Sequence, residues 1–181
     1  MEYWFWIVIC YSFFGYLLER MFAKVTASPR QVRKCFLLLP LCPVYGLAMG
    51  LHLALLPPEA GLAELAVRGA VVCTAAEYLV HLLYDRLLGV RFWDYTGAPG
   101  NLAGRICLPF SAAWGLLSAL AVRWVQPELA RLIALLPPGL TYAVLLILTA
   151  DILLSARLLR RWGDTELLGW RTLTARLRPA G

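Results

Sequence analysis

The chain has 181 residues, of which 61% are hydrophobic and 15% charged, and its formal net charge is +6. Soluble domains carry about 45–50% apolar and about 25% charged residues, because a small globule cannot hide more apolar surface from water. This composition excludes an ordinary soluble domain and indicates an integral membrane protein. The basic residues occur in short blocks between apolar runs, which favours signals of membrane orientation over a nucleic-acid-binding surface.

Five apolar runs follow one another along the chain, covering residues 3–22, 36–56, 65–83, 106–125 and 139–156. Each is close to the roughly 20 residues that a helix needs to cross about 30 Å of hydrocarbon. The first run has only Glu2 ahead of it and no small-residue cleavage site behind it, so we expect a transmembrane helix rather than a signal peptide. The sequence therefore predicts an all-α polytopic bundle of five spans, forming one domain over residues 1–157.

The orientation of these spans follows from the distribution of Lys and Arg. The connections after the first and third runs and the C-terminal tail, counted with Arg20 at the end of the first run and Arg157 just after the fifth, hold 14 of the 17 basic residues. Basic residues concentrate on the cytoplasmic side, so we expect the N-terminus outside and the C-terminus in the cytoplasm. In the basic tail, residues 158–181, Trp170, Leu173 and Leu177 recur at helical spacing. A short helix in the headgroup layer and a frayed tail fit this pattern about equally well.

Ionisable residues inside a membrane are costly and mark candidate functional sites. Glu77, His81 and Asp85 are spaced four residues apart in the third run and share one helical stripe. Such a stripe can relay protons, hold a cation or bind a polar substrate group. The alternative is structural: Glu77 is neutral, or pairs with His81 or an arginine to tie two helices together. For His81 the structural role is favoured, and Asp85 is expected to be solvated at the interface.

Other polar residues fall at the same expected depth. Glu19 ends the first run on the cytoplasmic side, and Asp151 lies in the inner part of the fifth run. The second run is interrupted by prolines between Pro40 and Gly46, around Cys42 and Tyr45. Freed backbone groups at this depth are tolerated only against protein or a wet cavity, and interrupted helices often form transport sites. A plain kink explains the prolines equally well.

The loop after the third run is the densest polar patch, with Trp93, Asp94, Asn101 and Arg105 among several glycines. Glycines let backbone N–H groups approach an anion, and the Arg105 guanidinium suits a carboxylate or a phosphate. The loop is therefore a candidate ligand-binding element that re-enters the membrane. Its aromatic residues serve equally well as ordinary interfacial anchors.

Several chemical motifs do not occur in the sequence. It has no Gly-x4-Gly-Lys-Ser/Thr phosphate loop, no His-Glu-x-x-His zinc motif and no Gly-x-Ser-x-Gly nucleophile elbow. His52 and His81 are expected at different depths, so we predict no metal site and no cofactor. The cysteines show no C-x-x-C spacing and are interpreted as small apolar residues. They are Cys10, Cys35, Cys42, Cys73 and Cys107.

Five segments resemble, in order, a permease-like group of bacterial membrane proteins, the putative ABC-transporter type IV family. They are YSFFGYLLE (Tyr11–Glu19), PLCPVYG (Pro40–Gly46), Glu77-Tyr78, Trp93–Tyr95 and NLAGRICLPFSAAWG (Asn101–Gly115). The family usually has an Asn-Arg-Gly segment and a Gly-Pro pair where this chain has Val32-Arg33-Lys34 and Leu39-Pro40. The resemblance implies a small multi-spanning bacterial membrane protein.

Three functions fit these observations. The favoured one is a permease-like transporter component of the cell (inner) membrane, with a cytoplasm-facing polar cavity and energy from a separate ATPase subunit. The alternatives are a membrane enzyme acting on a phosphate-bearing lipid, with Glu77 or Asp94 as base and Arg105 as anion clamp, and a non-catalytic scaffold or regulatory subunit. Partners are expected to be the lipid bilayer and an ATPase subunit or further copies of the chain, not nucleic acid.

The cavity is expected to be lined by the first, third and fifth spans, roofed by the loop of residues 93–105, with the break in the second span as one wall. Arg105 is expected to bind an anionic ligand group, or to pair with Glu19 or Glu77 when the cavity is empty. The candidate residues are Glu19, Tyr45, Glu77, His81, Trp93, Asp94, Asn101, Arg105 and Asp151.

Overall fold

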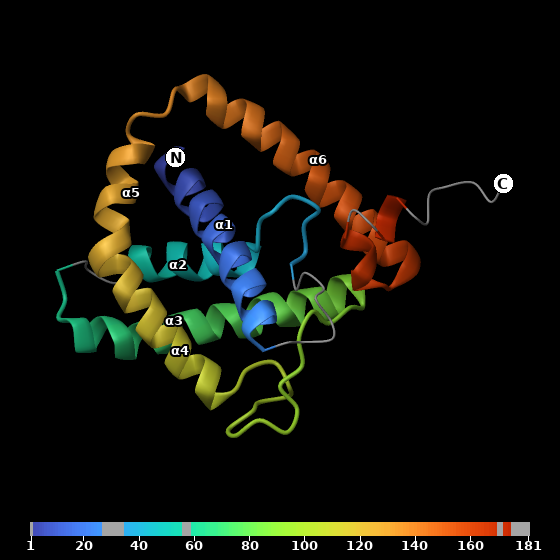
Figure 1. Ribbon diagram of the computed structural model, residues 1–181, viewed down its shortest axis with the longest axis horizontal. Helices are drawn as coiled ribbons and strands as arrows, with labels where there is room; N and C mark the ends of the chain where they lie inside the picture. Colours follow the sequence, from blue (N-terminus) through green and yellow to red (C-terminus); the bar gives the residue numbers. More distant parts are fainter. Residues whose placement is uncertain (1, 27–34, 56–58, 170–171, 175–181) are drawn as a thin grey trace.

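The apolar runs fold into helices in a computed structural model that describes residues 2–26, 35–55, 59–169 and 172–174 (Figure 1). The α-helices are α1 (Glu2–Val25), α2 (Pro43–Leu55), α3 (Leu62–Leu83), α4 (Leu108–Leu120), α5 (Gln126–Ile133) and α6 (Pro138–Trp162). The described residues form no β-strand, apart from one isolated bridge between Leu102 and Ile106. The prediction of an all-α bundle is therefore confirmed.

Four helical stretches are long and apolar enough to cross a membrane: Glu2–Val25, Leu62–Leu88, Leu108–Ile133 and Pro138–Trp162. Two of them contain a π-helical turn, η1 (Tyr84–Leu88) after α3 and η2 (Ala121–Val125) between α4 and α5. Pro127 explains η2, because a proline has no N–H and its ring conflicts with the carbonyl four residues earlier. The wider π turn accommodates that conflict, so α4, η2 and α5 continue as one helix.

The second apolar run differs from the prediction, because its first part is not helical. Residues 36–42 form bends and irregular backbone, and α2 begins only at Pro43. Pro40 and Pro43 explain the delay, since a proline disfavours helical backbone in the residue before it and is itself favoured in the first helical turn. At about 1.5 Å per residue the 13 residues of α2 rise about 20 Å, which is too short to cross the hydrocarbon alone.

The non-helical segment is held inside the protein. The Asp151 carboxylate of α6 accepts two of its backbone hydrogen bonds, from Leu38 N at 3.1 Å and Leu39 N at 3.0 Å. At its end, Cys42 N donates to the carbonyl oxygen of Ser12 in α1 at 2.8 Å. Irregular backbone is stable at membrane depth only when its polar groups are satisfied in this way. Five side chains of the segment are buried: Cys35, Leu37, Leu38, Leu41 and Cys42.

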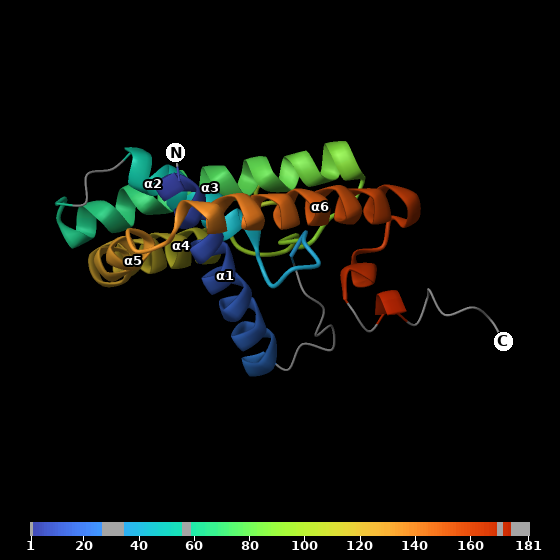
Figure 2. The same ribbon diagram turned by 90° about the horizontal axis from the view of Figure 1, so that it is seen from above.

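The helices pack in the order α1 on α2, α2 on α3 and α3 on α4 (Figures 1 and 2). Helix α6 contacts α1 near Thr141 and η1 near Arg160. Glycines allow the closest approaches. A side chain at Gly46 of α2 would collide with the Val8 carbonyl of α1, and one at Gly115 of α4 with the Ala66 carbonyl of α3. Small residues at helix crossings are typical of packing in membranes.

The C-terminal part folds back beside the end of α6. Helix α6 runs to Trp162, beyond the expected boundary after residue 157, and ends at Gly163 with a left-handed φ of 60°. Leu168 and Leu173 are buried in a cluster with Val90 and Phe92 of the loop after η1. The proposed tail helix cannot be followed, since Trp170 and Leu177 lie outside the described residues.

Candidate functional site

A pocket of about 210 Å³ lies between the end of α1, the start of α4 and the loop that follows η1. Two carboxylates from different helices reach it, Glu19 of α1 and Glu77 of α3. Tyr45 of α2 and Trp93 of the loop also line it, so the pocket brings together four of the nine candidate residues. Its aromatic lining consists of Phe22, Tyr45, Trp93, Tyr95, Phe110 and Trp114.

Glu77 is buried in the bundle, with 4% of its surface exposed, as expected from the cost of facing lipid. Tyr95 OH donates to its Oε1 at 3.0 Å, and Trp114 Nε1 donates to its Oε2 at 3.0 Å. Its hydrogen-bond partners are therefore neither His81 nor an arginine. Burial, and next the adjacent Glu77 carboxylate, raise the pKa of Tyr95 well above its ordinary range, so the phenol keeps its proton and remains a donor.

Glu19 is tied to α2 across the helix interface. Tyr45 OH donates to Glu19 Oε1 at 2.9 Å. Gly15 lies one turn earlier on the same face of α1, where the Tyr45 ring occupies the space that a side chain would need. The Tyr45 ring also lies 4.8 Å from the Trp114 ring, measured between centroids. One aromatic wall thus joins the hydrogen-bond partners of both carboxylates.

Arg105 does not line this pocket, and the expectation that it pairs with Glu19 or Glu77 is wrong. Its Nη2 lies 2.7 Å from Asp85 Oδ2, and its guanidinium lies 5.6 Å from the centre of the Tyr78 ring. Asp85, expected to be solvated, is shared with Arg91 at 3.3 Å. The reason is distance along the helix: Asp85 lies two turns, or about 12 Å, beyond Glu77.

His81 supports the pocket from behind. Its Nε2 lies 3.1 Å from the Trp93 carbonyl oxygen, and its ring meets the Trp93 ring edge-on at 5.1 Å between centroids. Trp93 Nε1 in turn donates to the Arg105 carbonyl oxygen at 2.9 Å. His81 therefore contacts a lining residue and is not itself part of the pocket lining.

Asp94 and Asn101 shape the loop and do not line the pocket. Asp94 Oδ1 accepts hydrogen bonds from Thr96 N at 2.9 Å and from Thr96 Oγ1 at 2.6 Å. These bonds hold the pKa of Asp94 below its ordinary value. Asn101 Nδ2 donates to the Ala98 carbonyl oxygen at 3.1 Å, and Gly104 N donates to Asn101 Oδ1 at 3.4 Å. Asp151 accepts hydrogen bonds from Leu38 N and Leu39 N instead. The expectation that the fifth span lines the cavity is therefore wrong, since no described residue of α6 lines this pocket.

Sequence reasoning did not single out the aromatic partners Tyr95 and Trp114. Both fall in segments that carried the family resemblance, but an aromatic residue near a helix end is usually an interfacial anchor. The sequence does contain an indirect signal for these two residues. A buried carboxylate requires hydrogen-bond donors, and Tyr and Trp side chains in the adjoining segments can provide them.

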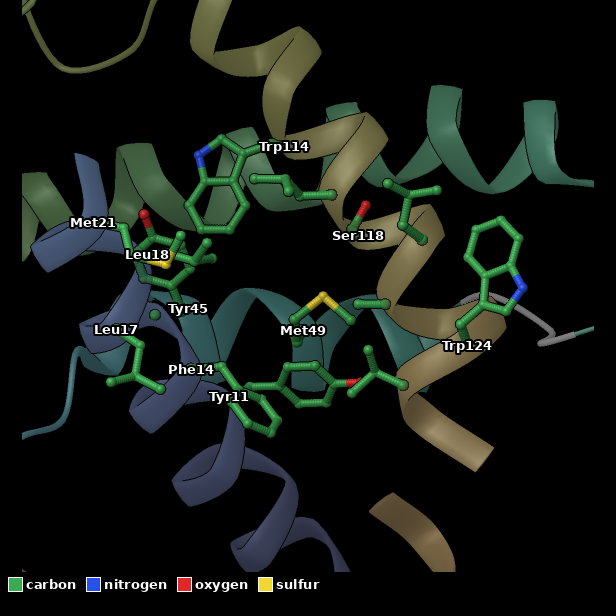
Figure 3. A pocket seen from close by; sticks show the side chains of 15 residues that line it. Tyr11, Phe14, Leu17, Leu18, Met21, Tyr45, Met49, Trp114, Ser118 and Trp124 are labelled. Carbon is green, nitrogen blue, oxygen red and sulfur yellow. The ribbon is translucent and has the colours of Figure 1, made fainter. Parts of the chain in front are cut away.

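The pocket continues into an apolar groove with a volume of about 490 Å³. The two share Leu18, Tyr45, Trp114 and Leu117 in their linings. Figure 3 shows the groove between α1 and α4, with Met49 of α2 as its floor and Trp124 at the far end. Among the described residues, no group of three or more His, Cys, Asp or Glu side chains is arranged to hold a metal ion.

Comparison with known proteins identifies the family. A family model described as "Putative ABC-transporter type IV" matches residues 5–156. No curated protein and no solved structure matches the chain. The family match covers most of the sequence and includes both pocket carboxylates, and the four long apolar helices agree with a membrane protein. The chain thus belongs to the putative ABC-transporter type IV family.

Proposed function

We propose that this chain is a permease-like subunit of a transporter in the cell (inner) membrane, and that the pocket between Glu19 and Glu77 receives the transported solute from the cytoplasm. The observation that carries the proposal is the convergence of two carboxylates, from α1 and α3, on one pocket. Carboxylates are costly inside a membrane and commonly mark substrate or ion pathways. The transporter family implies a separate ATPase subunit as the source of energy.

The proposed topology has five crossings, with the N-terminus outside. In this arrangement the segment of residues 35–42 and helix α2 together form the second crossing. Two observations support it: the basic residues concentrate in alternate connections, and Asp151 and Ser12 satisfy backbone N–H groups of the non-helical part. Discontinuous crossings beside a binding site are a recurrent feature of transporters.

The alternative of an enzyme acting on a phosphate-bearing lipid has less support. Arg105, its expected anion clamp, is engaged by Asp85. Among the described residues, the pocket lining includes two acids and no lysine or arginine, so it offers a phosphate group repulsion and no cationic partner.

Purification of the full chain from its native membranes in a mild detergent tests the proposal. We expect an ATPase subunit with a phosphate-binding loop to co-purify, and the complex to hydrolyse ATP after reconstitution into liposomes. Glu77→Gln should retain the ATPase subunit and change the rate of hydrolysis. Glu64→Gln is the matched control, since Glu64 lies on the same helix but pairs with Arg68 at an exposed site. Absence of an ATPase from the purified material would refute the proposal.

A further inference from the structure

The charge and aromatic content of the pocket limit what it can bind. Glu19 and Glu77 are the charged residues in its described lining. Two described basic side chains of the neighbouring elements are engaged elsewhere: Arg105 pairs with Asp85, and Arg20 donates to Tyr16 OH at 3.0 Å. Aromatic faces attract cations, and the attraction grows when water is excluded. Acids surrounded by aromatic rings therefore favour an organic cation.

The rings are already arranged around the space that such a cation would occupy. Phe110 stacks on Tyr95 with their centroids 4.8 Å apart, and Phe22 meets Phe110 edge-on at 6.0 Å. Tyr45 and Trp114 also line the pocket, and they donate hydrogen bonds to Glu19 and Glu77 respectively. The two carboxylates thus lie beside the rings and can neutralise a positive charge held in the pocket.

The groove adds a requirement for an apolar tail. Its volume of about 490 Å³ lies within the roughly 300–1,000 Å³ of typical ligand sites. Its few polar groups are used internally: Ser118 Oγ donates to the Gly115 carbonyl oxygen, and Tyr11 OH donates to Gln126. Leu17, Met21 and Trp124 on its rim are exposed, with exposed fractions of 41%, 62% and 60%, so the groove opens sideways where the proposed topology puts lipid.

We propose that the pocket and groove together bind a single-chain cationic amphiphile. Its amine or quaternary ammonium group lies between Glu19 and Glu77, and its hydrocarbon tail lies along the groove between α1 and α4 (Figure 3). A zwitterionic phospholipid fits less well, because its phosphate would meet two acids and, among the described lining residues, no lysine or arginine. The inference rests on the proposed function, since it names the class of solute taken up at the same pocket.

Binding of tritiated dodecyltrimethylammonium to the full chain in phosphatidylcholine nanodiscs tests this, with empty nanodiscs as the blank. We expect saturable binding of one molecule per chain, displaced by unlabelled probe but not by dodecyl sulfate, which has the same tail and an anionic head. Glu77→Gln should weaken binding about tenfold or more, and Glu64→Gln should leave it unchanged. Equal displacement by dodecyl sulfate, or equal binding by Glu77→Gln, would overturn the inference.

Two exposed positions keep the test decisive if Glu77→Gln does not fold. Phe110→Leu removes a ring from the pocket and should weaken binding several-fold. Leu17→Trp narrows the groove and should weaken dodecyltrimethylammonium while leaving tetramethylammonium unaffected. If both variants bound dodecyltrimethylammonium as tightly as the wild type, the inference would be overturned. Binding requires no ATPase, so selective binding without an ATPase partner would refute the proposed function alone, and an active ATPase complex without head-group selectivity would refute this inference alone.

Discussion

Replacement of Asp151 should release the non-helical segment before α2. The Asp151 carboxylate accepts hydrogen bonds from Leu38 N and Leu39 N of this segment. Ser155 Oγ donates a third hydrogen bond to the same carboxylate at 3.2 Å. Asp151 is itself buried, with 8% of its surface exposed, so water cannot easily replace it. Asp151→Ala removes the carboxylate acceptor of two backbone donors at a depth where irregular backbone depends on internal partners.

The magnitude follows from the number of bonds lost. A hydrogen bond to a charged group contributes about 1.5–3 kcal/mol, so loss of two such bonds destabilises the segment by about 3–6 kcal/mol. Asp151→Asn should cost about half as much, because the amide oxygen still accepts one bond while its NH₂ group faces the second donor. The order of stability should therefore be wild type, then Asn, then Ala.

Thiol labelling reports the release directly. Cys35 and Cys42 flank the segment and are 1% and 2% exposed, whereas Cys10 is half-buried. A thiol-reactive dye should modify Cys10 in every variant but modify Cys35 and Cys42 faster in Asp151→Asn and fastest in Asp151→Ala. Thr149→Ala is the control on the same helix, since its exposed hydroxyl bonds only to the Leu145 carbonyl. Unchanged labelling of both cysteines in Asp151→Ala would refute the reasoning.

Three further predictions concern topology, packing and pH. Reporter fusions after Gly61 and Gly97 should be located outside and inside respectively, and signals on one side would refute five crossings. Gly46→Leu should lower the melting temperature of the purified protein, because a side chain there meets the Val8 carbonyl of α1; an unchanged melting temperature would contradict this packing. The lowered pKa of Asp94 means that its bonds to Thr96 are fully present above its ordinary pKa and are lost only as the pH falls through the lowered value. Proteolysis of the loop should therefore be equally slow at pH 7 and pH 5, and faster at both in Asp94→Asn.

The long helices could be predicted because hydrocarbon imposes a length on every span. Runs of about 20 apolar residues have no stable alternative in a bilayer, so four of the five became long helices. The second run satisfied the same hydropathy criterion and still unwound at its start. Hydropathy counts side chains and not backbone donors, and the acceptor that stabilises the unwound backbone, Asp151, is more than 100 residues away in the chain.

The site was partly predictable for a related reason. The cost of charge in a membrane singled out Glu19, Glu77 and Asp151 as residues that require internal partners. It gave neither the direction in which each side chain points nor the partner that it meets. Arg105 shows the consequence: it pairs with Asp85 at the end of the stripe rather than with the carboxylates of the pocket.

The hydrogen-bond donors distinguish the two carboxylates of the pocket, Glu19 and Glu77, from Asp151. The donors to Asp151 are the Ser155 hydroxyl and two backbone N–H groups, and the backbone groups cannot turn away without unfolding the segment. The donors to Glu19 and Glu77 include side chains on the pocket wall, a tyrosine hydroxyl in one case and a tyrosine hydroxyl and an indole in the other. These donors line the pocket, so a ligand in the proposed site would lie beside the groups that hold the two carboxylates. A buried acid that accepts from backbone N–H groups stabilises the fold, whereas the two acids of the proposed binding site accept from aromatic side chains that line a cavity.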